Sequence, residues 1–288
     1  MEKILNLAAS LLAMGVAAFP AEANEMVEKG AYLTAAAGCQ ACHTDPKEKQ
    51  AFAGGRPLKT PFGIFYSPNI TPDSKSGIGN WTEEEFIKAV KQGISPEGSH
   101  YFPAFPYTSY AKMTDQDAKA IFAYLRSLSP IERENRDHEI GAPFSWRWLQ
   151  TGWKLLFFDD KTPAPLADKK LDRGRYLVDA LGHCGECHTP RNSLGGLDQS
   201  RYLAGMAGGG EGELVSNITP DPKTGIGDWS TGDMVSFLET GMKPDFDDVQ
   251  GSMEEVISHG TSKLTKEDRE AMAEYLRSIT PIENKISR

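Results

Sequence analysis

The chain has 288 residues, of which 39% are hydrophobic and 25% charged, and its formal net charge is −9. This length predicts about two domains of ordinary size, and the composition is typical of soluble globular proteins with a buried core. The acidic balance argues against a nucleic-acid partner.

The first 23 residues have the pattern of an export signal. Lys3 precedes an apolar run over residues 4–18, and Ala21-Glu-Ala23 offers the small residues that a signal peptidase reads. The run is too short, and wrongly flanked, for a spanning helix; an uncleaved anchor is the alternative interpretation. We expect a signal peptide over residues 1–23, cleaved near Ala23, and a mature protein in the periplasm.

Four short motifs occur twice in the same order, which predicts a duplication. They are K-G-A-Y-L (29–33) and R-G-R-Y-L (173–177), S-P-N-I-T-P-D (67–73) and V-S-N-I-T-P-D (215–221), G-I-G-N-W (77–81) and G-I-G-D-W (225–229), and A-Y-L-R-S-L-S-P (123–130) and E-Y-L-R-S-I-T-P (274–281). We therefore expect one domain over residues 25–131, called the first repeat, and another over residues 168–288, called the second repeat. Residues 132–167 link them.

Each repeat has the pattern of three or more helices around a long loop rich in Gly, Pro and Asn. The first helix is expected near residues 26–37. Another begins at Thr82, where Glu85 completes a capping box, and the last begins at Thr114 in the first repeat and at Thr265 in the second. Few stretches alternate as strands do. The predicted fold class is all-α, with two tandem domains.

All four cysteines fall in two C-x-x-C-H motifs. The motifs are Cys39-Gln-Ala-Cys42-His43 and Cys184-Gly-Glu-Cys187-His188. In this pattern two thiols form thioethers to one haem, and the histidine supplies the proximal imidazole to iron. Two redox dithiols, or one four-cysteine zinc site, are the alternatives, but neither explains the histidine after each pair. The prediction is two covalently attached haem c groups.

The segment 142–158 holds three of the five tryptophans and is too aromatic for a flexible linker. One interpretation is a docking surface for a partner or a membrane interface. The other, which we favour, is a strap buried between the two domains that fixes the distance from haem to haem.

Taken together, these motifs resemble the multi-haem cytochrome c subunits of periplasmic alcohol, aldehyde and gluconate dehydrogenases, and more closely the diheme cytochromes c related to them. The resemblance covers nearly the whole chain after the leader. It implies a class I cytochrome c fold in each domain. It also implies electron transfer from a periplasmic dehydrogenase to the respiratory chain, through a cytochrome or oxidase as acceptor. Those subunits usually carry three haems, whereas this chain has two motifs; peripheral membrane contact is an open alternative.

The resemblance also suggests iron ligands. His43 and His188 are the expected proximal ligands, and Pro46 and Pro190 close behind them could offer carbonyls that orient the imidazoles. Met253 lies where a class I cytochrome places its axial methionine, so we expect it on haem 2, with Met242 as competitor.

The distal ligand of haem 1 is less determined, because Phe105 stands where the related subunits often carry methionine. Met113 is our first choice, and His100 is the alternative, since it aligns with Met253 if two residues are inserted afterwards. An open sixth position is the third option. It would suit a diheme redox enzyme, peroxidase-like or thiosulfate-oxidising, with haem 1 as its catalytic centre.

Overall fold

The computed structural model describes residues 21–209 and 212–287. The predicted leader lies outside the described residues, apart from Ala21 to Ala23 at the start of the first helix. The helices are α1 (Ala21–Ala36), α2 (Cys39–Cys42), α3 (Glu83–Gln92), α4 (Tyr107–Tyr110), α5 (Asp115–Ser127), α6 (Leu149–Phe157), α7 (Lys169–Arg175), α8 (Gly185–His188), α9 (Thr231–Thr240), α10 (Ser252–His259) and α11 (Lys266–Ser278). Single turns are η1 (Tyr176–Leu181), η2 (Gln199–Arg201) and η4 (Thr261–Lys263).

Two short sheets add strands that the sequence pattern did not predict. The strands β1 (Pro57–Thr60), β2 (Gly63–Tyr66) and β3 (Glu139–Ile140) form one antiparallel sheet, and β4 (Met206–Ala207) pairs with β5 (Leu214–Val215). Pro57 pairs with Tyr66 and Thr60 with Gly63. Strands of two to four residues are too short to show an alternating pattern. The all-α expectation is confirmed only in part: the described residues are mostly helical, and the two short sheets were not expected.

A pair of crossed helices occurs in each repeat. The first repeat packs α1 against α5, and the second packs α7 against α11. A Cβ added at Gly30 would lie 1.9 Å from the carbonyl oxygen of Ala120, and one at Gly174 would lie 2.0 Å from that of Ala271. Because only glycine permits this approach, the K-G and R-G dipeptides of the repeated motif mark the two crossings.

The predicted helix starts agree with the structure. Thr82 is the N-cap of α3 and forms a capping box with Glu85, and α9 begins with a matching box. Thr114 and Thr265 are the N-caps of α5 and α11. The first helix begins earlier than predicted, at Ala21.

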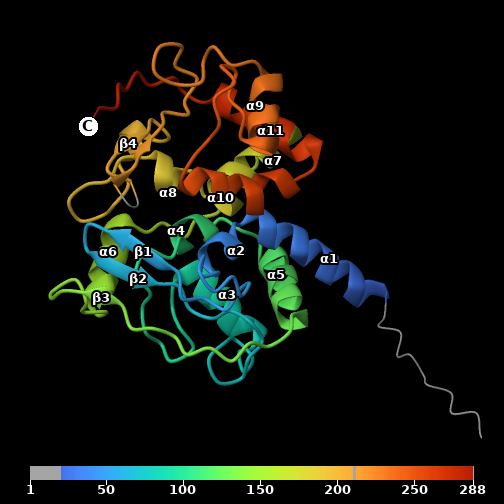
Figure 1. Ribbon diagram of the computed structural model, residues 1–288, viewed down its shortest axis with the longest axis vertical. Coiled ribbons are helices and arrows are strands. Elements are labelled where there is room, and N and C mark those ends of the chain that lie inside the picture. Colours follow the sequence, from blue (N-terminus) through green and yellow to red (C-terminus); the bar gives the residue numbers. More distant parts are fainter. Residues whose placement is uncertain (1–20, 210–211, 288) are drawn as a thin grey trace, which may run out of the picture.

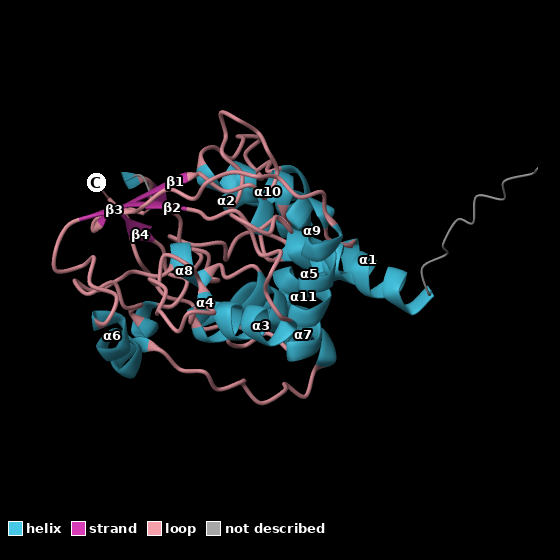
Figure 2. Ribbon diagram, turned by 90° about the horizontal axis from the view of Figure 1, so that it is seen from below, coloured by secondary structure: helices cyan, strands magenta, loops and turns pink. Residues whose placement is uncertain are grey.

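The two repeats lie against each other along an interface formed by α1 and several short helices. Figure 1 shows the first repeat in blue to green and the second in yellow to red, with α10 beside α2 at their boundary. The main contacts across it are those of α10 with α2, of α4 with η1, and of α1 with both η4 and η1. Most helices gather at one end of the molecule, with the strands and α6 at the other (Figure 2).

The segment 142–158 forms α6 and lies across both repeats. The ammonium of Lys154 donates to the carbonyls of Gln92 (2.5 Å) and Gly93 (2.9 Å) in the first repeat. The indole N–H of Trp153 donates to the carbonyl of Leu194 in the second repeat, at 2.9 Å. The inner face of this segment therefore connects the two repeats.

Its outer face is exposed, so the expectation that the strap is buried between the two domains is wrong for this face. Trp148, Leu155 and Leu156 expose 67%, 84% and 71% of their surface. The rings of Trp146 and Trp148 stack on each other, with centroids 6.1 Å apart. A nine-residue helix presents one face inward and the rest outward, and here the apolar side chains fall on both. Within the described ranges 21–209 and 212–287, no helix is long and apolar enough to cross a membrane.

Candidate haem-binding site

Each C-x-x-C-H motif folds as one helical turn. In the first, the backbone N–H of His43 donates to the carbonyl of Cys39 at 2.9 Å, and in the second that of His188 donates to Cys184 at 2.9 Å. One turn brings residues three and four apart onto the same face of the helix. The two thiols and the imidazole of each motif therefore project from one short element.

The proximal histidines are oriented by backbone carbonyls. Nδ1 of His43 lies 2.7 Å from the carbonyl oxygen of Pro68, and Nδ1 of His188 lies 2.7 Å from that of Ser216. A carbonyl only accepts, so Nδ1 carries the proton and Nε2 keeps its lone pair free for a metal. The expectation that Pro46 and Pro190 supply these carbonyls is wrong.

The repeated N-I-T motif holds the loops that carry those carbonyls. Asn69 and Asn217 are each 2% exposed. Their side-chain oxygens accept from the backbone N–H and hydroxyl of Thr71 and Thr219, at 2.8 to 2.9 Å. Their amide nitrogens donate to carbonyls just beyond α5 and α11, at 2.7 and 2.8 Å. This burial excludes glycosylation and explains why the motif recurs.

We expect Asn217→Ala to lower the free energy of unfolding by about 2 to 3 kcal/mol, because buried partners of its amide are left unsatisfied. Asn80→Ala is the matched control, since Asn80 makes an exposed bond to the carbonyl of Ser74; we expect it to cost less than about 1 kcal/mol. Urea unfolding of both variants measures the difference. Equal losses would contradict the role of the buried amide.

The pKa values of the cysteines bear on the redox-dithiol alternative. Burial raises the pKa of Cys39 and of Cys184 to about 12, whereas reactive dithiols have lowered thiol pKa values. These thiols therefore lack the character of a reactive dithiol. Over the described part of the chain, no group of three or more Cys, His, Asp or Glu is placed to hold a metal ion.

On the distal side, two matching hairpins define how the repeats align. Ile94 pairs with His100, and Met242 pairs with Asp248. His100 thus matches Asp248, so its alignment with Met253 is wrong. The second repeat has three more residues than the first between this hairpin and the N-cap of its last helix, Thr265 against Thr114. The match of Phe105 with Met253 therefore stays a prediction from the sequence motifs.

His100 is also engaged elsewhere. Its Nδ1 lies 2.9 Å from the ammonium of Lys154. Burial lowers the pKa of Lys154 to about 8, so at neutral pH this ammonium is charged and only donates. Nδ1 must then accept, which places the imidazole proton on Nε2 and leaves no lone pair there for iron.

Burial of Lys154 should also make the free energy of unfolding rise with pH. It is 9% exposed, and its pKa is lowered in the folded protein from 10.5 to about 8. Between these values the unfolded chain holds a proton that the folded chain has released, so this group adds stability as pH rises. We expect Lys154→Met to remove that rise, measured by urea unfolding near pH 8 and pH 10. An unchanged slope would contradict the burial of the ammonium.

Met113 lies in the core of the first repeat. It is 2% exposed, as part of the same core cluster as Leu264, its counterpart in the second repeat. Its backbone N–H donates to the carbonyl of Tyr110, whose hydroxyl donates to the carbonyl of Ala37 at 2.8 Å. Met113 is therefore connected through Tyr110 to the residues just before Cys39.

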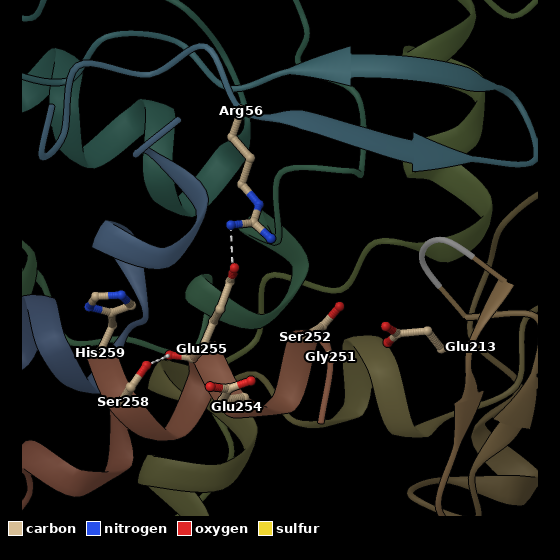
Figure 3. Close-up of a pocket in the computed structure, with 8 residues that line it drawn as sticks. All are labelled: Arg56, Glu213, Gly251, Ser252, Glu254, Glu255, Ser258 and His259. Atoms are coloured by element: carbon tan, nitrogen blue, oxygen red, sulfur yellow. Dashed lines mark hydrogen bonds and ion pairs between the residues drawn. The ribbon is translucent and has the colours of Figure 1, made fainter. Parts of the chain in front are cut away.

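Met253 is half-buried on α10, which packs against the first haem motif. Arg56 bridges the two elements: its guanidinium donates to the carbonyl of Ala41 at 3.1 Å and pairs with Glu255 at 2.5 Å (Figure 3). Arg56 and Glu255 line a polar cavity of about 420 Å³. Met242 is 45% exposed.

A reciprocal contact occurs at the second haem motif. Glu186 accepts hydrogen bonds from the hydroxyls of Thr108 (2.5 Å) and Ser109 (2.9 Å) on α4, and pairs with Arg191 at 2.6 Å. Each haem motif thus lies against the segment that follows the hairpin of the other repeat. The spacing of motifs in the sequence could not predict these contacts, because the residues that form them are far apart in the chain.

The site consists of two helical turns with paired thiols, and in each the adjacent histidine keeps its Nε2 lone pair free for a metal. This arrangement defines the site of a c-type cytochrome. A model of the cytochrome c family matches residues 27–129. The chain is 43% identical to a protein of Cereibacter sphaeroides named diheme cytochrome c-type, over 88% of this chain and 86% of that protein. The chain belongs to the cytochrome c family.

Two further relatives are subunits of dehydrogenases. The chain is 39% identical to the gluconate 2-dehydrogenase cytochrome c subunit of Pantoea cypripedii, over 97% of this chain and 65% of that subunit. It is 41% identical to the fructose dehydrogenase cytochrome subunit of Gluconobacter japonicus, over 90% of this chain and 54% of that subunit. The chain thus spans between half and two thirds of the length of these two dehydrogenase subunits.

Proposed function

We propose that this protein is a periplasmic electron carrier with two covalently attached haem c groups, one in each of two cytochrome c domains over residues 25–131 and 168–288. When bound, each haem would supply an iron that alternates between the ferrous and ferric states. The observation that carries the proposal is the matched bond of 2.7 Å from each proximal histidine to a loop carbonyl. In both repeats this bond directs the Nε2 lone pair away from the loop.

The residues of each repeat have separate tasks in this proposal. Cys39 and Cys42 would hold haem 1, and Cys184 and Cys187 would hold haem 2. The loop carbonyls keep each imidazole neutral and oriented, which raises its basicity as a ligand. On the distal side we propose Met253 for haem 2. For haem 1 we propose Met113, because His100 directs its ring nitrogen to Lys154.

We propose a dehydrogenase as the electron donor and a cytochrome or oxidase of the respiratory chain as the acceptor. Support for the donor comes from the relatives, which are cytochrome subunits of gluconate, fructose and alcohol dehydrogenases. Reduction of the purified holoprotein by a gluconate, fructose or alcohol dehydrogenase turning over its substrate tests this. Failure with every donor, while chemical reductants still reduce both haems, would contradict the assignment.

The rival proposal, a redox enzyme with haem 1 as catalytic centre, rests on Phe105 at the position that matches Met253. It requires a high-spin haem with a free sixth position and turnover with peroxide or thiosulfate. We expect neither. Location is tested separately: after osmotic shock the mature protein should appear in the periplasmic fraction, beginning near residue 24. Retention of residues 1–23 in a membrane fraction would favour the anchor.

A further inference from the structure

The repeated K-G-A-Y-L and R-G-R-Y-L motifs, which precede the two haem motifs, have a structural role that is separate from haem binding. Tyr32 of the first repeat and Tyr176 of the second occupy the same place in the K-G-A-Y-L and R-G-R-Y-L motifs. Each hydroxyl reaches into the other repeat. Tyr32 donates to Asp268 at 2.6 Å, and Tyr176 donates to Asp117 at 2.6 Å.

Both aspartates occupy the third position of a terminal helix. At α3 and α9 the side chain at this position returns to the backbone N–H of the N-cap residue and completes a capping box. At α5 and α11 that N–H is satisfied differently: Thr114 donates to the hydroxyl of Tyr176 at 3.2 Å, and Thr265 to that of Tyr32 at 3.1 Å. Each tyrosine is therefore inserted into the capping box of the opposite repeat.

A basic side chain of the same repeat keeps each aspartate ionised. Lys29 pairs with Asp117 at 2.6 Å, and Arg173 binds Asp268 with two bonds of 2.9 and 2.6 Å. Burial alone would raise the pKa of Asp117, but its hydrogen bonds to Lys29 and Tyr176 outweigh burial and leave the pKa below its usual value. An ionised acceptor makes a stronger bond to each tyrosine than a neutral one.

We propose that Tyr32 and Tyr176 are positioning residues that lock the two repeats in one relative orientation and thereby fix the distance between the two haems. This inference rests on the proposed two-haem function. The K/R-G-x-Y motif then has three tasks within four residues. The cation keeps the aspartate ionised, the glycine permits the helix crossing, and the tyrosine joins the repeats.

If the two tyrosines lock the repeats together, replacing one tyrosine must also affect the amide bound by the other. Two independent local hydrogen bonds would not have this effect. Tyr176→Phe removes the partner of the Thr114 amide, so faster hydrogen exchange at Thr114 is expected in any case. If the repeats separate as a unit, exchange at Thr265 must also accelerate, although its own partner Tyr32 is intact. Loss of one bond to a charged acceptor shifts the equilibrium toward separated repeats by about tenfold or more. We expect that factor in the exchange rate of Thr265 in the holoprotein, measured by NMR.

Tyr66→Phe is the matched control, because Tyr66 donates to Glu139 at the same distance of 2.6 Å without reaching the second repeat. It should leave Thr114 and Thr265 unchanged. Tyr32→Phe is the reverse test, and it keeps the proposal falsifiable if one variant does not accumulate. Acceleration confined to the amide that lost its own partner would overturn the lock.

Pulse reduction of the double variant tests the consequence for electron transfer. The wild type should equilibrate an electron between its haems in one fast phase. The variant with both tyrosines replaced should add a slow phase from molecules with separated repeats, while its ligand spectra stay unchanged. Identical kinetics would overturn the link to haem distance. A protein without covalent haem would instead refute the proposed function, and the same exchange experiment on the folded protein as purified would still decide the lock.

Discussion

Replacing Met113 by leucine is expected to remove about half of the near-infrared sulfur-to-iron band of the oxidised protein and to lower the reduction potential of one haem. Leucine already occupies the matching position 264 in the core of the second repeat, so the change should cost less than about 1.5 kcal/mol of stability. The band and an optical redox titration measure the effect.

Two further variants make this test specific. Met272→Leu is the control, because Met272 is also a methionine 2% exposed but lies on α11 and is not a predicted ligand; it should leave the band intact. Phe105→Met, added to Met113→Leu, should restore the band, since residue 105 is predicted from the sequence motifs to match Met253. A band that Met113→Leu leaves unchanged would show that haem 1 takes its ligand elsewhere.

Gly30→Ala should destabilise the protein by at least about 2 kcal/mol, because overpacking against backbone cannot be relieved by a rotamer change. The added Cβ would lie 1.9 Å from the carbonyl oxygen of Ala120, in the crossing of α1 with α5. Gly174→Ala should have the same effect at the crossing of α7 with α11, where the distance is 2.0 Å. Thermal and urea unfolding of the holoprotein measure both losses.

The control for the glycine series is Gly152→Ala in α6. Nothing lies within 4 Å of a Cβ added there, and alanine is favoured over glycine in a helix by up to about 1 kcal/mol. This variant should be neutral or slightly more stable. If Gly30→Ala proved equally harmless, the helix crossing would not depend on the missing side chain.

The sequence predicted the helix starts, because each depends on a local pattern of capping residues, as at Thr82 and Glu85. It also singled out His43 and His188, whose role as iron ligands stays a prediction. It did not predict which carbonyls orient them, since Pro68 and Ser216 are distant in the chain from the histidines that they bind. Proximity in sequence favoured Pro46 and Pro190, but the fold brings a later loop to each imidazole.

The errors on the distal side have a related cause. The paired hairpins exclude the alignment of His100 with Met253, because His100 occupies the place of Asp248. The segment 142–158 was expected to be buried because it is aromatic, yet only its inner face contacts the repeats. Composition reports how apolar a segment is, whereas exposure depends on which side chains face the protein. The contacts between the repeats, including the exchanged tyrosines, have no local signal at all.

The central claim is that each repeat binds one haem c through its own C-x-x-C-H motif. Intact mass of the exported protein, combined with absorbance of the pyridine haemochrome, tests it most directly. We predict two covalent haems in the wild type and one in the Cys39→Ala/Cys42→Ala and Cys184→Ala/Cys187→Ala variants. A wild-type mass without haem, or loss of both haems when either motif alone is removed from a folded protein, would contradict the claim.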